Sequence, residues 1–295
     1  MITVMGASGH IGRRITELLL DSGEKVRALA RSKEKLAPLE KKGAEVQTGD
    51  AADARFLASA FRGTEGVFTL LPPDSRSTDY RVLQDRMGEA MAKAVRESGV
   101  RRVVFLSSVG ADLPAGTGPI AGLHVHEERL RQLEGVEVLN LRPGYFFENF
   151  EETLGLIKHQ GINGGAIAPD VAIPMIATRD IADAAAQALR ERRFQGVVVQ
   201  ELLGPRDLSH SEATRILGAR LGKKDLPYVQ FPYDDFVKAL VQTGLSENVA
   251  SLYAEMARAL NEGKVKSLEG RRPDNTTKTR FEDFAAELED AYRAA

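Results

Sequence analysis

The sequence contains no cysteine among its 295 residues, which excludes disulfide bonds, thiolate catalysis and cysteine-based zinc sites. An excess of either charge is also lacking, because 40 lysines and arginines nearly balance 42 aspartates and glutamates, for a formal net charge of −2. This balance does not favour nucleic acid as a partner. No apolar run approaches the ~20 residues of a membrane span, and the first residues form a strand pattern rather than a secretory leader. We therefore expect a soluble cytoplasmic protein without direct nucleic-acid or membrane partners.

Histidine is scarce, with five residues in the chain, and its spacing does not suggest a metal site. His124 and His126 are two positions apart, so on a helix they would point to different faces and make a poor pair of ligands. His10 lies inside a glycine turn, where its backbone rather than its imidazole would be used. We assign no ligand role to His159 or His210, and we expect no bound metal.

Short apolar segments alternate with helical patterns through the first half of the chain. Runs such as Val103-Val104-Phe105-Leu106 are typical of strands buried on both faces, as in a parallel sheet. Repeated strand–helix units predict a doubly wound α/β fold with ligands at the carboxyl ends of the strands. We expect a Rossmann fold with helices on both faces of a parallel sheet, whose first strands cover residues 2–5, 25–30, 44–48, 66–71, 102–109 and 136–141.

The second half keeps the alternation but is less regular. We expect a helix over 149–159, a glycine-rich loop at 161–165 that could form a pocket lid, and strands at 173–177, 197–203 and 228–231. No flexible linker separates the halves. Residues 1–150 are therefore assigned to a dinucleotide-binding Rossmann domain with further strands from 170–205, and residues 151–295 to a smaller α/β cap interleaved with the sheet.

The first twelve residues combine an apolar run with three glycines and lead directly into a helical pattern. A strand, a glycine turn and a helix in this order form a phosphate-binding unit. Gly6 would permit the sharp turn, Gly9 the approach of backbone to a pyrophosphate, and Gly12 close packing of helix on strand. The N–H groups at the helix start would face the anion. A glycine triplet alone is a weak signal, but its place at the head of alternating strand–helix units strengthens it.

The residue that closes the second strand selects between the two dinucleotides. An acid there binds the ribose 2′-hydroxyl of NAD, whereas an arginine accommodates the 2′-phosphate of NADP. Arg31 occupies this position, with Ser32 beside it and Lys35 one turn later. We expect NADP(H) to be preferred over NAD(H); the alternative is that Arg31 is a solvated charge at a strand end.

Five segments form a set that is more specific than any one of them. They are Gly-Ala-Ser-Gly-His-Ile-Gly at 6–12, Val-Arg-Ala-Leu-Ala-Arg at 26–31, Gly-Asp at 49–50, Ser-Ser-Val-Gly-Ala at 107–111 and Arg-Pro-Gly-Tyr-Phe-Phe-Glu-Asn at 142–149. Together they resemble the NmrA-like group of atypical short-chain dehydrogenase/reductases, over nearly the whole chain. That group includes NAD(P)H-dependent quinone, azo-dye and triphenylmethane-dye reductases as well as redox-sensing transcriptional regulators. The resemblance implies the fold and the cofactor but is a poor guide to the substrate.

Carried over position by position, the resemblance also implies where cofactor and substrate would lie. The glycine turn would hold the pyrophosphate, and Asp50 with Ala51 would border the adenine, although Asp50 could instead be a turn-forming acid. The expected cofactor residues are Gly6, Ser8, Gly9, His10, Ile11, Gly12, Arg31, Lys35, Asp50, Ala51, Leu70, Leu71, Pro72, Ser107, Pro143 and Tyr145. The expected substrate residues are Pro73, Val109, His124, Phe146, Phe147 and Asn149.

The chain departs from the carbonyl-reducing short-chain dehydrogenases at their catalytic pair. Those enzymes use Tyr-x-x-x-Lys on the helix after the fifth strand, where the lysine lowers the tyrosine pKa. This chain has Ile120 and His124 in those positions. An unperturbed imidazole, with a pKa of ~6.5, could bind the ribose or supply a proton, or His124 could simply line the pocket. The candidate catalytic residues are therefore His124, Tyr145 and Ser108.

Reactions that need no dedicated acid remain possible. Hydride transfer to a quinone or a conjugated dye depends mainly on orientation over the nicotinamide, because the acceptor delocalises charge and water can protonate it. Tyr145, Phe146 and Phe147 could form a flat wall for such an acceptor, with Tyr145 as a proton donor; the alternative is core packing.

We therefore expect an NADPH-dependent oxidoreductase that reduces a small aromatic, quinone or azo-type acceptor without a Tyr-x-x-x-Lys pair. The alternative is an NADP(H)-binding redox sensor that acts through protein partners, and isoflavone-reductase-like or epimerase-like chemistry is a third possibility. A monomer or a homodimer is expected.

Overall fold

The computed structural model describes residues 1–294 and is built on a seven-stranded sheet in which every neighbouring pair is parallel. The strand order is β10-β6-β5-β4-β1-β2-β3. Strands β2 and β3 are added on one side of β1, and the later strands, from β4 onward, on its other side. The strand order therefore reverses between β1 and β4, the place where doubly wound folds bind ligands. The strands are β1 (Ile2–Val4), β2 (Val26–Ala30), β3 (Glu45–Thr48), β4 (Gly66–Thr69), β5 (Arg102–Leu106), β6 (Glu137–Pro143) and β10 (Val197–Leu202).

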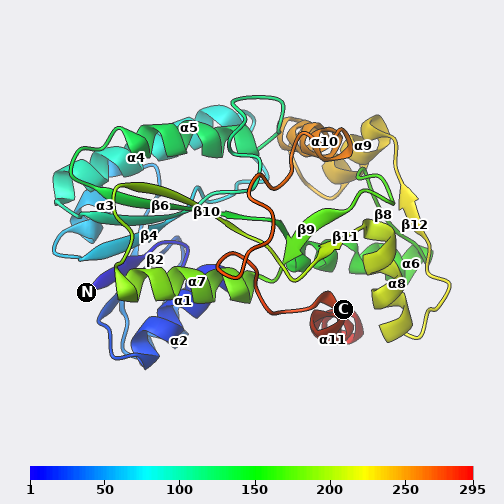
Figure 1. The fold of residues 1–295 in the computed structure, drawn as a ribbon, viewed down its shortest axis with the longest axis horizontal. Coiled ribbons are helices and arrows are strands. Elements are labelled where there is room, and N and C mark those ends of the chain that lie inside the picture. The colour runs from blue at the N-terminus through cyan, green and yellow to red at the C-terminus, as the bar shows by residue number, and fades with distance from the viewer. Residues whose placement is uncertain (295) are drawn as a thin grey trace.

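Helices cover both faces of this sheet, as predicted (Figure 1). One face carries α3 (Ala54–Phe61), α4 (Tyr80–Ser98) and α5 (Ile120–Arg131), and the other carries α1 (His10–Asp21) and α7 (Thr178–Glu191). A short 3-10 turn (Glu34–Leu36) and α2 (Ala37–Lys41) follow β2. The sequence of β5 does not alternate between apolar and polar residues, because both faces of this strand are buried. Val103 and Phe105 belong to the core under α3–α5, and Val104 belongs to the core under α1 and α7.

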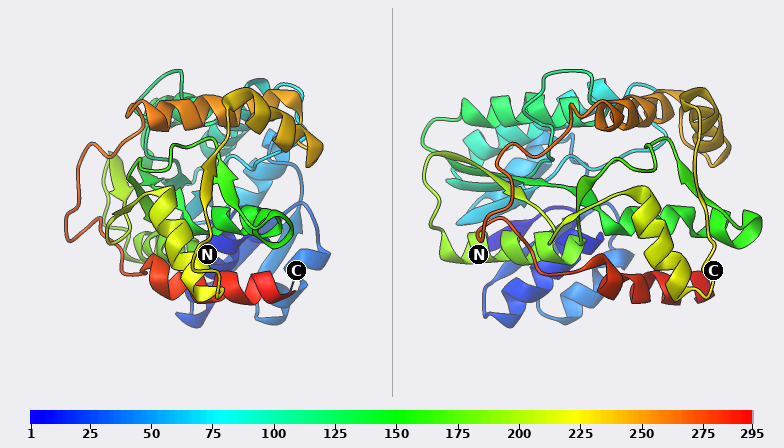
Figure 2. Two further views of the ribbon diagram at one scale, coloured as in Figure 1. Left: turned by 90° about the vertical axis from the view of Figure 1, so that its right-hand side faces the viewer. Right: turned by 45° about the vertical axis from the view of Figure 1, so that its right-hand side comes forward.

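The second lobe lies beyond the carboxyl ends of the main strands (Figures 1 and 2). It contains a three-stranded sheet of order β11-β9-β7 and a parallel pair of β8 with β12. Its elements are β7 (Tyr145–Phe146), a 3-10 helix (Phe147–Thr153), α6 (Leu154–Gln160), β8 (Asn163–Gly165), β9 (Ile173–Ile176), β11 (Asp207–Leu208), α8 (His210–Arg220), β12 (Tyr228–Gln230), α9 (Tyr233–Gln242), α10 (Glu247–Asn261) and α11 (Phe281–Ala294).

Three expectations for the second half are corrected. The segment over 149–159 is a 3-10 helix followed by α6, because Phe147 and Phe150 turn into the cap core. The glycine-rich segment 161–165 is no lid: it contains β8, and a Cβ on Gly164 would lie 2.6 Å from the ring of Phe231. Of the strands expected over 170–205, β10 joins the main sheet, but β9 pairs with β7 and β11 instead.

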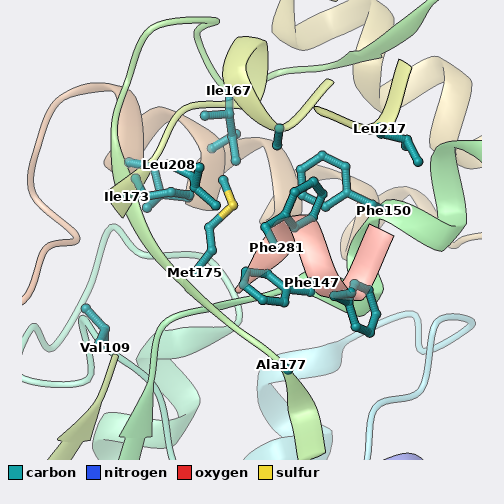
Figure 3. Packing of buried hydrophobic residues seen from close by; sticks show 14 of the residues in the cluster. Val109, Phe147, Phe150, Ile167, Ile173, Met175, Ala177, Leu208, Leu217 and Phe281 are labelled. Atoms are coloured by element: carbon teal, nitrogen blue, oxygen red, sulfur yellow. The ribbon is translucent and has the colours of Figure 1, made fainter. Parts of the chain in front are cut away.

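An aromatic cluster forms the centre of the cap core (Figure 3). The ring centroids of Phe147 and Phe281 are 5.1 Å apart, and those of Phe150 and Phe281 are 5.0 Å apart. Because Phe281 begins α11, the end of the described chain packs on the segment that leaves β6. No helix among residues 1–294 is long and apolar enough to cross a membrane.

Candidate cofactor and substrate site

A cleft with a volume of about 610 Å³ opens at the carboxyl ends of β1, β2, β3 and β4. This is the switch point of the sheet, where the fold predicts a dinucleotide. Many of the residues that the sequence assigned to the cofactor line it, together with Pro73 from the expected substrate set. They are Gly6, Ser8, Gly9, Arg31, Asp50, Ala51, Leu70 and Pro72.

The glycine turn has the geometry that a bound phosphate requires. Gly6 has a φ of +65°, which favours glycine, and a Cβ on Gly12 would lie 2.4 Å from the Gly6 carbonyl oxygen. Helix α1 begins after Gly9 without a side chain that caps it, so the first N–H groups of the helix are free for an anion. The turn therefore fits a dinucleotide pyrophosphate, with His10, Ile11 and Gly12 presenting backbone at the helix start.

Arg31 closes β2 and lines the cleft. Its side chain is exposed and forms no ion pair within residues 1–294, so the guanidinium is available for a 2′-phosphate. Lys35 lies in the following 3-10 turn and does not line the cleft. Leu71 is 6% exposed and packs in the core below α3 and α4, next to the cleft residues Leu70 and Pro72.

A second cavity, of about 200 Å³, lies at the carboxyl ends of β5 and β6 under the cap. Residues expected to contact the nicotinamide or the substrate line it: Ser108, Val109, Pro143, Tyr145, Phe146 and Asn149. Ile120 also lines it, at the position of the missing catalytic tyrosine. Met256 and Leu260 of α10 form a further part of its wall. None of its lining residues, within the part of the chain that the structure describes, carries a charge.

Among the described residues that line this cavity, Tyr145 is the one ionisable group. Burial raises its pKa, Glu152 raises it further, and a hydrogen bond with Asn149 partly offsets these effects. The Tyr145 ring meets the His210 ring edge to face at 5.3 Å between centroids. Tyr145 therefore stays protonated at neutral pH, unlike a tyrosine whose pKa is lowered by a neighbouring lysine.

His124 does not line either cavity, although it lies on the predicted helix. Its Nδ1 is 2.8 Å from the Ala111 carbonyl oxygen. Because a carbonyl oxygen only accepts, Nδ1 carries a proton and donates it to this oxygen. Phe147 is also absent from the substrate cavity, since its ring is 1% exposed and packs in the cap core.

A buried polar network below the substrate cavity was missed by the sequence reasoning. Glu127 is 1% exposed and accepts from Arg142 at 2.9 Å (Nε) and 2.6 Å (Nη2). The Ser107 hydroxyl also donates to this carboxylate. Ser107 thus holds the end of β5 to α5 and β6 instead of pointing freely at a ligand. One sequence feature could have pointed to this network, because Arg142 is the first residue of the 142–149 segment that carries the family resemblance.

The sequence profile of the NmrA-like family matches residues 1–286. The chain belongs to the NmrA-like family. It is 27% identical over 265 residues to an NAD(P)H azoreductase from Xenophilus azovorans. The alignment covers 87% of this chain and 86% of that protein. The structural comparisons agree with this membership at the level of the fold.

Two solved structures have this fold across nearly their whole length. An NADPH-dependent quinone oxidoreductase from Escherichia coli, complexed with NADPH, has a TM-score of 0.81 and 23% identity, covering 98% of this chain and 99% of that one. A triphenylmethane reductase from Citrobacter sp., complexed with NADP(H), has a TM-score of 0.81 and 21% identity, covering 98% of this chain and 100% of that one. At these identities the likeness establishes the common fold.

Proposed function

We propose that this NmrA-like protein is an NADPH-dependent oxidoreductase that reduces a small, flat aromatic acceptor of the quinone or azo type. The observation that carries the proposal is the cavity at the ends of β5 and β6, which is largely apolar, has no charged lining residue within residues 1–294, and lies at the same edge of the main sheet as the dinucleotide cleft. Such a cavity suits an acceptor that binds through its rings. The azoreductase relative supports the same reaction class.

The cofactor part of the proposal rests on the glycine turn and on Arg31. Bound NADPH would supply the hydride. The first N–H groups of α1 would bind the pyrophosphate, and the unpaired Arg31 guanidinium would bind the 2′-phosphate. NADH lacks this phosphate, so we expect it to bind more weakly.

The acceptor part rests on orientation rather than on acid catalysis. Ser108, Tyr145 and Asn149 supply the polar groups of the cavity, and Ile120, Met256 and Leu260 supply much of the apolar wall. A protonated Tyr145 can donate a hydrogen bond to a carbonyl oxygen or an azo nitrogen of the acceptor. Solvent would then supply the proton that completes the reduction, which is feasible because charge in a conjugated acceptor is delocalised.

The test is steady-state oxidation of NADPH and NADH at 340 nm with benzoquinone, menadione and a monoazo dye. We expect turnover with at least one acceptor and a higher kcat/KM for NADPH. Arg31→Ala should remove that preference by weakening NADPH about tenfold or more, the cost of one charge-assisted contact to a phosphate. Tight NADP(H) binding without turnover of any acceptor would instead favour a redox sensor, and equal losses for both cofactors would remove Arg31 from the recognition.

A further inference from the structure

A second arginine lines the dinucleotide cleft, and neither the sequence motifs nor the family resemblance assigns it a role. Arg86 lies on the exposed side of α4, between Leu83 and Met87, which also line the cleft. Nearby arginines are paired: Arg81 with Glu255 at 3.2 Å, and Arg129 with Asp85. Arg86 makes no ion pair or side-chain hydrogen bond within residues 1–294.

The end of the cleft that Arg86 borders is apolar. Its walls come from Phe56 and Leu57 of α3 and from Leu83 and Met87 of α4. The Phe56 ring packs directly against Gly49, because a Cβ on that glycine would lie 2.6 Å from three of the ring carbons. Leu57 and Met87 are buried at 0% and 4% exposure, so the walls belong to the packed core between α3 and α4.

This end of the cleft is suited to a base rather than to a phosphate. The groups that would bind phosphate lie elsewhere, at the start of α1 and at Arg31 after β2. An apolar slot takes up the faces of a planar ring, and a guanidinium can stack on such a ring or donate to its nitrogens. Asp50 and Ala51, at the end of β3, form the remaining border of the slot.

We propose that Arg86 binds the adenine ring of the dinucleotide in the slot between α3 and α4. Arg31 would read the 2′-phosphate, which differs between the two cofactors, whereas Arg86 would hold the base, which is common to both. The inference rests on the proposed use of NADP(H), but it makes a separate prediction because its effect does not depend on the 2′-phosphate.

The test measures dissociation constants by isothermal titration calorimetry for NADPH, NADH and NMN, which lacks the adenosine half. Arg86→Ala should weaken NADPH and NADH by the same factor of about ten, the scale of one cation–π contact, and leave NMN unchanged. Arg86→Lys should not restore the affinity, because an ammonium keeps the charge but loses the planar stack. Arg96→Ala, an exposed arginine on α4 outside the cleft, is the matched control and should change none of the three.

The outcomes separate the two arginines. A much larger loss for NADPH than for NADH in Arg86→Ala would make Arg86 a phosphate or charge contact and overturn the proposal. Full affinity in Arg86→Lys, weaker binding of NMN, or no change at all would overturn it as well. Arg31→Ala, measured in parallel, tests the NADP(H) preference independently. If that variant weakens NADPH and NADH equally, Arg31 does not select the cofactor, but the equal loss of NADPH and NADH affinity predicted for Arg86→Ala still stands.

Discussion

At the scale of single residues, the protonation state of Tyr145 determines whether it orients the acceptor by a hydrogen bond or donates a proton to it. Burial raises its pKa, and no cationic side chain in the described chain lines the cavity to lower it. Tyr145 is therefore suited to orient an acceptor through a hydrogen bond and poorly suited to act as a general acid. In related folds, a tyrosine activated by lysine acts as the general acid. The two roles can be distinguished by how much activity is lost when the hydroxyl is removed.

Tyr145→Phe should lower kcat/KM for a quinone by about tenfold or less, because one hydrogen bond contributes ~0.5–1.5 kcal/mol. The measurement is NADPH oxidation at 340 nm with menadione. Loss of a general acid typically costs ~10²–10⁴-fold. A drop in that range, with NADPH affinity unchanged, would make Tyr145 the proton donor. His124→Ala, changed at a residue outside the cavity, should leave kcat nearly unchanged.

Glu127 and Arg142 provide a prediction for stability at the same scale. Glu127→Gln leaves Arg142 as a buried charge without its carboxylate, and breaking such a pair costs ~3–5 kcal/mol of unfolding free energy. Urea denaturation measures this loss. The control is Glu128→Gln, the adjacent residue on α5, whose pair with Arg131 is about half exposed on both sides and should change stability by less than ~1 kcal/mol. Equal effects of the two variants would contradict a structural role for the buried network.

At the scale of elements, α10 joins the two cavities. The Tyr80 N–H donates to the Asn248 side chain at 2.9 Å, and the Ser246 N–H donates to the Ser75 carbonyl at 2.8 Å. These bonds attach the start of α10 to the first residue of α4 and to the segment before it, in which Pro72 and Pro73 line the cofactor cleft. Further along, α10 places Met256 and Leu260 in the substrate wall. The position of the α10 wall of the substrate cavity thus depends on contacts that α10 makes beside the cofactor cleft.

Asn248→Ala should raise the KM for the acceptor several-fold while the affinity for NADPH changes little, because it loosens α10 and leaves the glycine turn and Arg31 in place. Acceptor kinetics and NADPH titration give the two values. Glu247→Ala, in the same turn but exposed, is the matched control. An unchanged KM together with a lower melting temperature would show that these contacts only stabilise the fold.

The sequence predicted those elements whose signals are local. Three glycines between a strand and a helix fix the phosphate turn, and Arg31 follows from its place at the end of β2. The wall made by α10 could not be predicted, because Met256 and Leu260 lie more than a hundred residues from Tyr145 and carry only an ordinary helical pattern. Phe147 was placed wrongly for a related reason: the 3-10 geometry that turns its ring toward Phe281 has no clear signature in the sequence.

At the scale of the whole molecule, two buried histidines link stability to pH. His126 is 0% exposed, and its ring meets that of Phe105 edge to face at 4.7 Å. Burial lowers its pKa to about 3, with a smaller contribution from Arg129, and burial lowers the pKa of His210 to about 4. Both are therefore neutral in the folded protein at pH values where they would be protonated in the unfolded chain.

A group whose folded pKa is lowered contributes stability above its unfolded pKa and loses it as pH falls. The unfolding free energy should therefore decrease from about pH 6.5 down to about pH 4 for His210 and about pH 3 for His126, by up to ~1.4 kcal/mol per pH unit for each histidine. His126→Gln should flatten this dependence in urea unfolding measured at several pH values. His159→Gln, an exposed histidine, should leave the slope unchanged, and an equal slope for His126→Gln and the native protein would contradict this assignment.

The central claim, that this NmrA-like protein transfers a hydride from NADPH to a flat acceptor, is tested most directly in a single turnover. The protein is mixed with one equivalent of NADPH and then with excess menadione in a stopped-flow instrument at 340 nm. We predict rapid loss of the absorbance, slowed by a primary isotope effect when the transferred hydrogen at C4 is deuterium. NADPH that binds tightly but stays reduced with menadione, benzoquinone and a monoazo dye would contradict the claim.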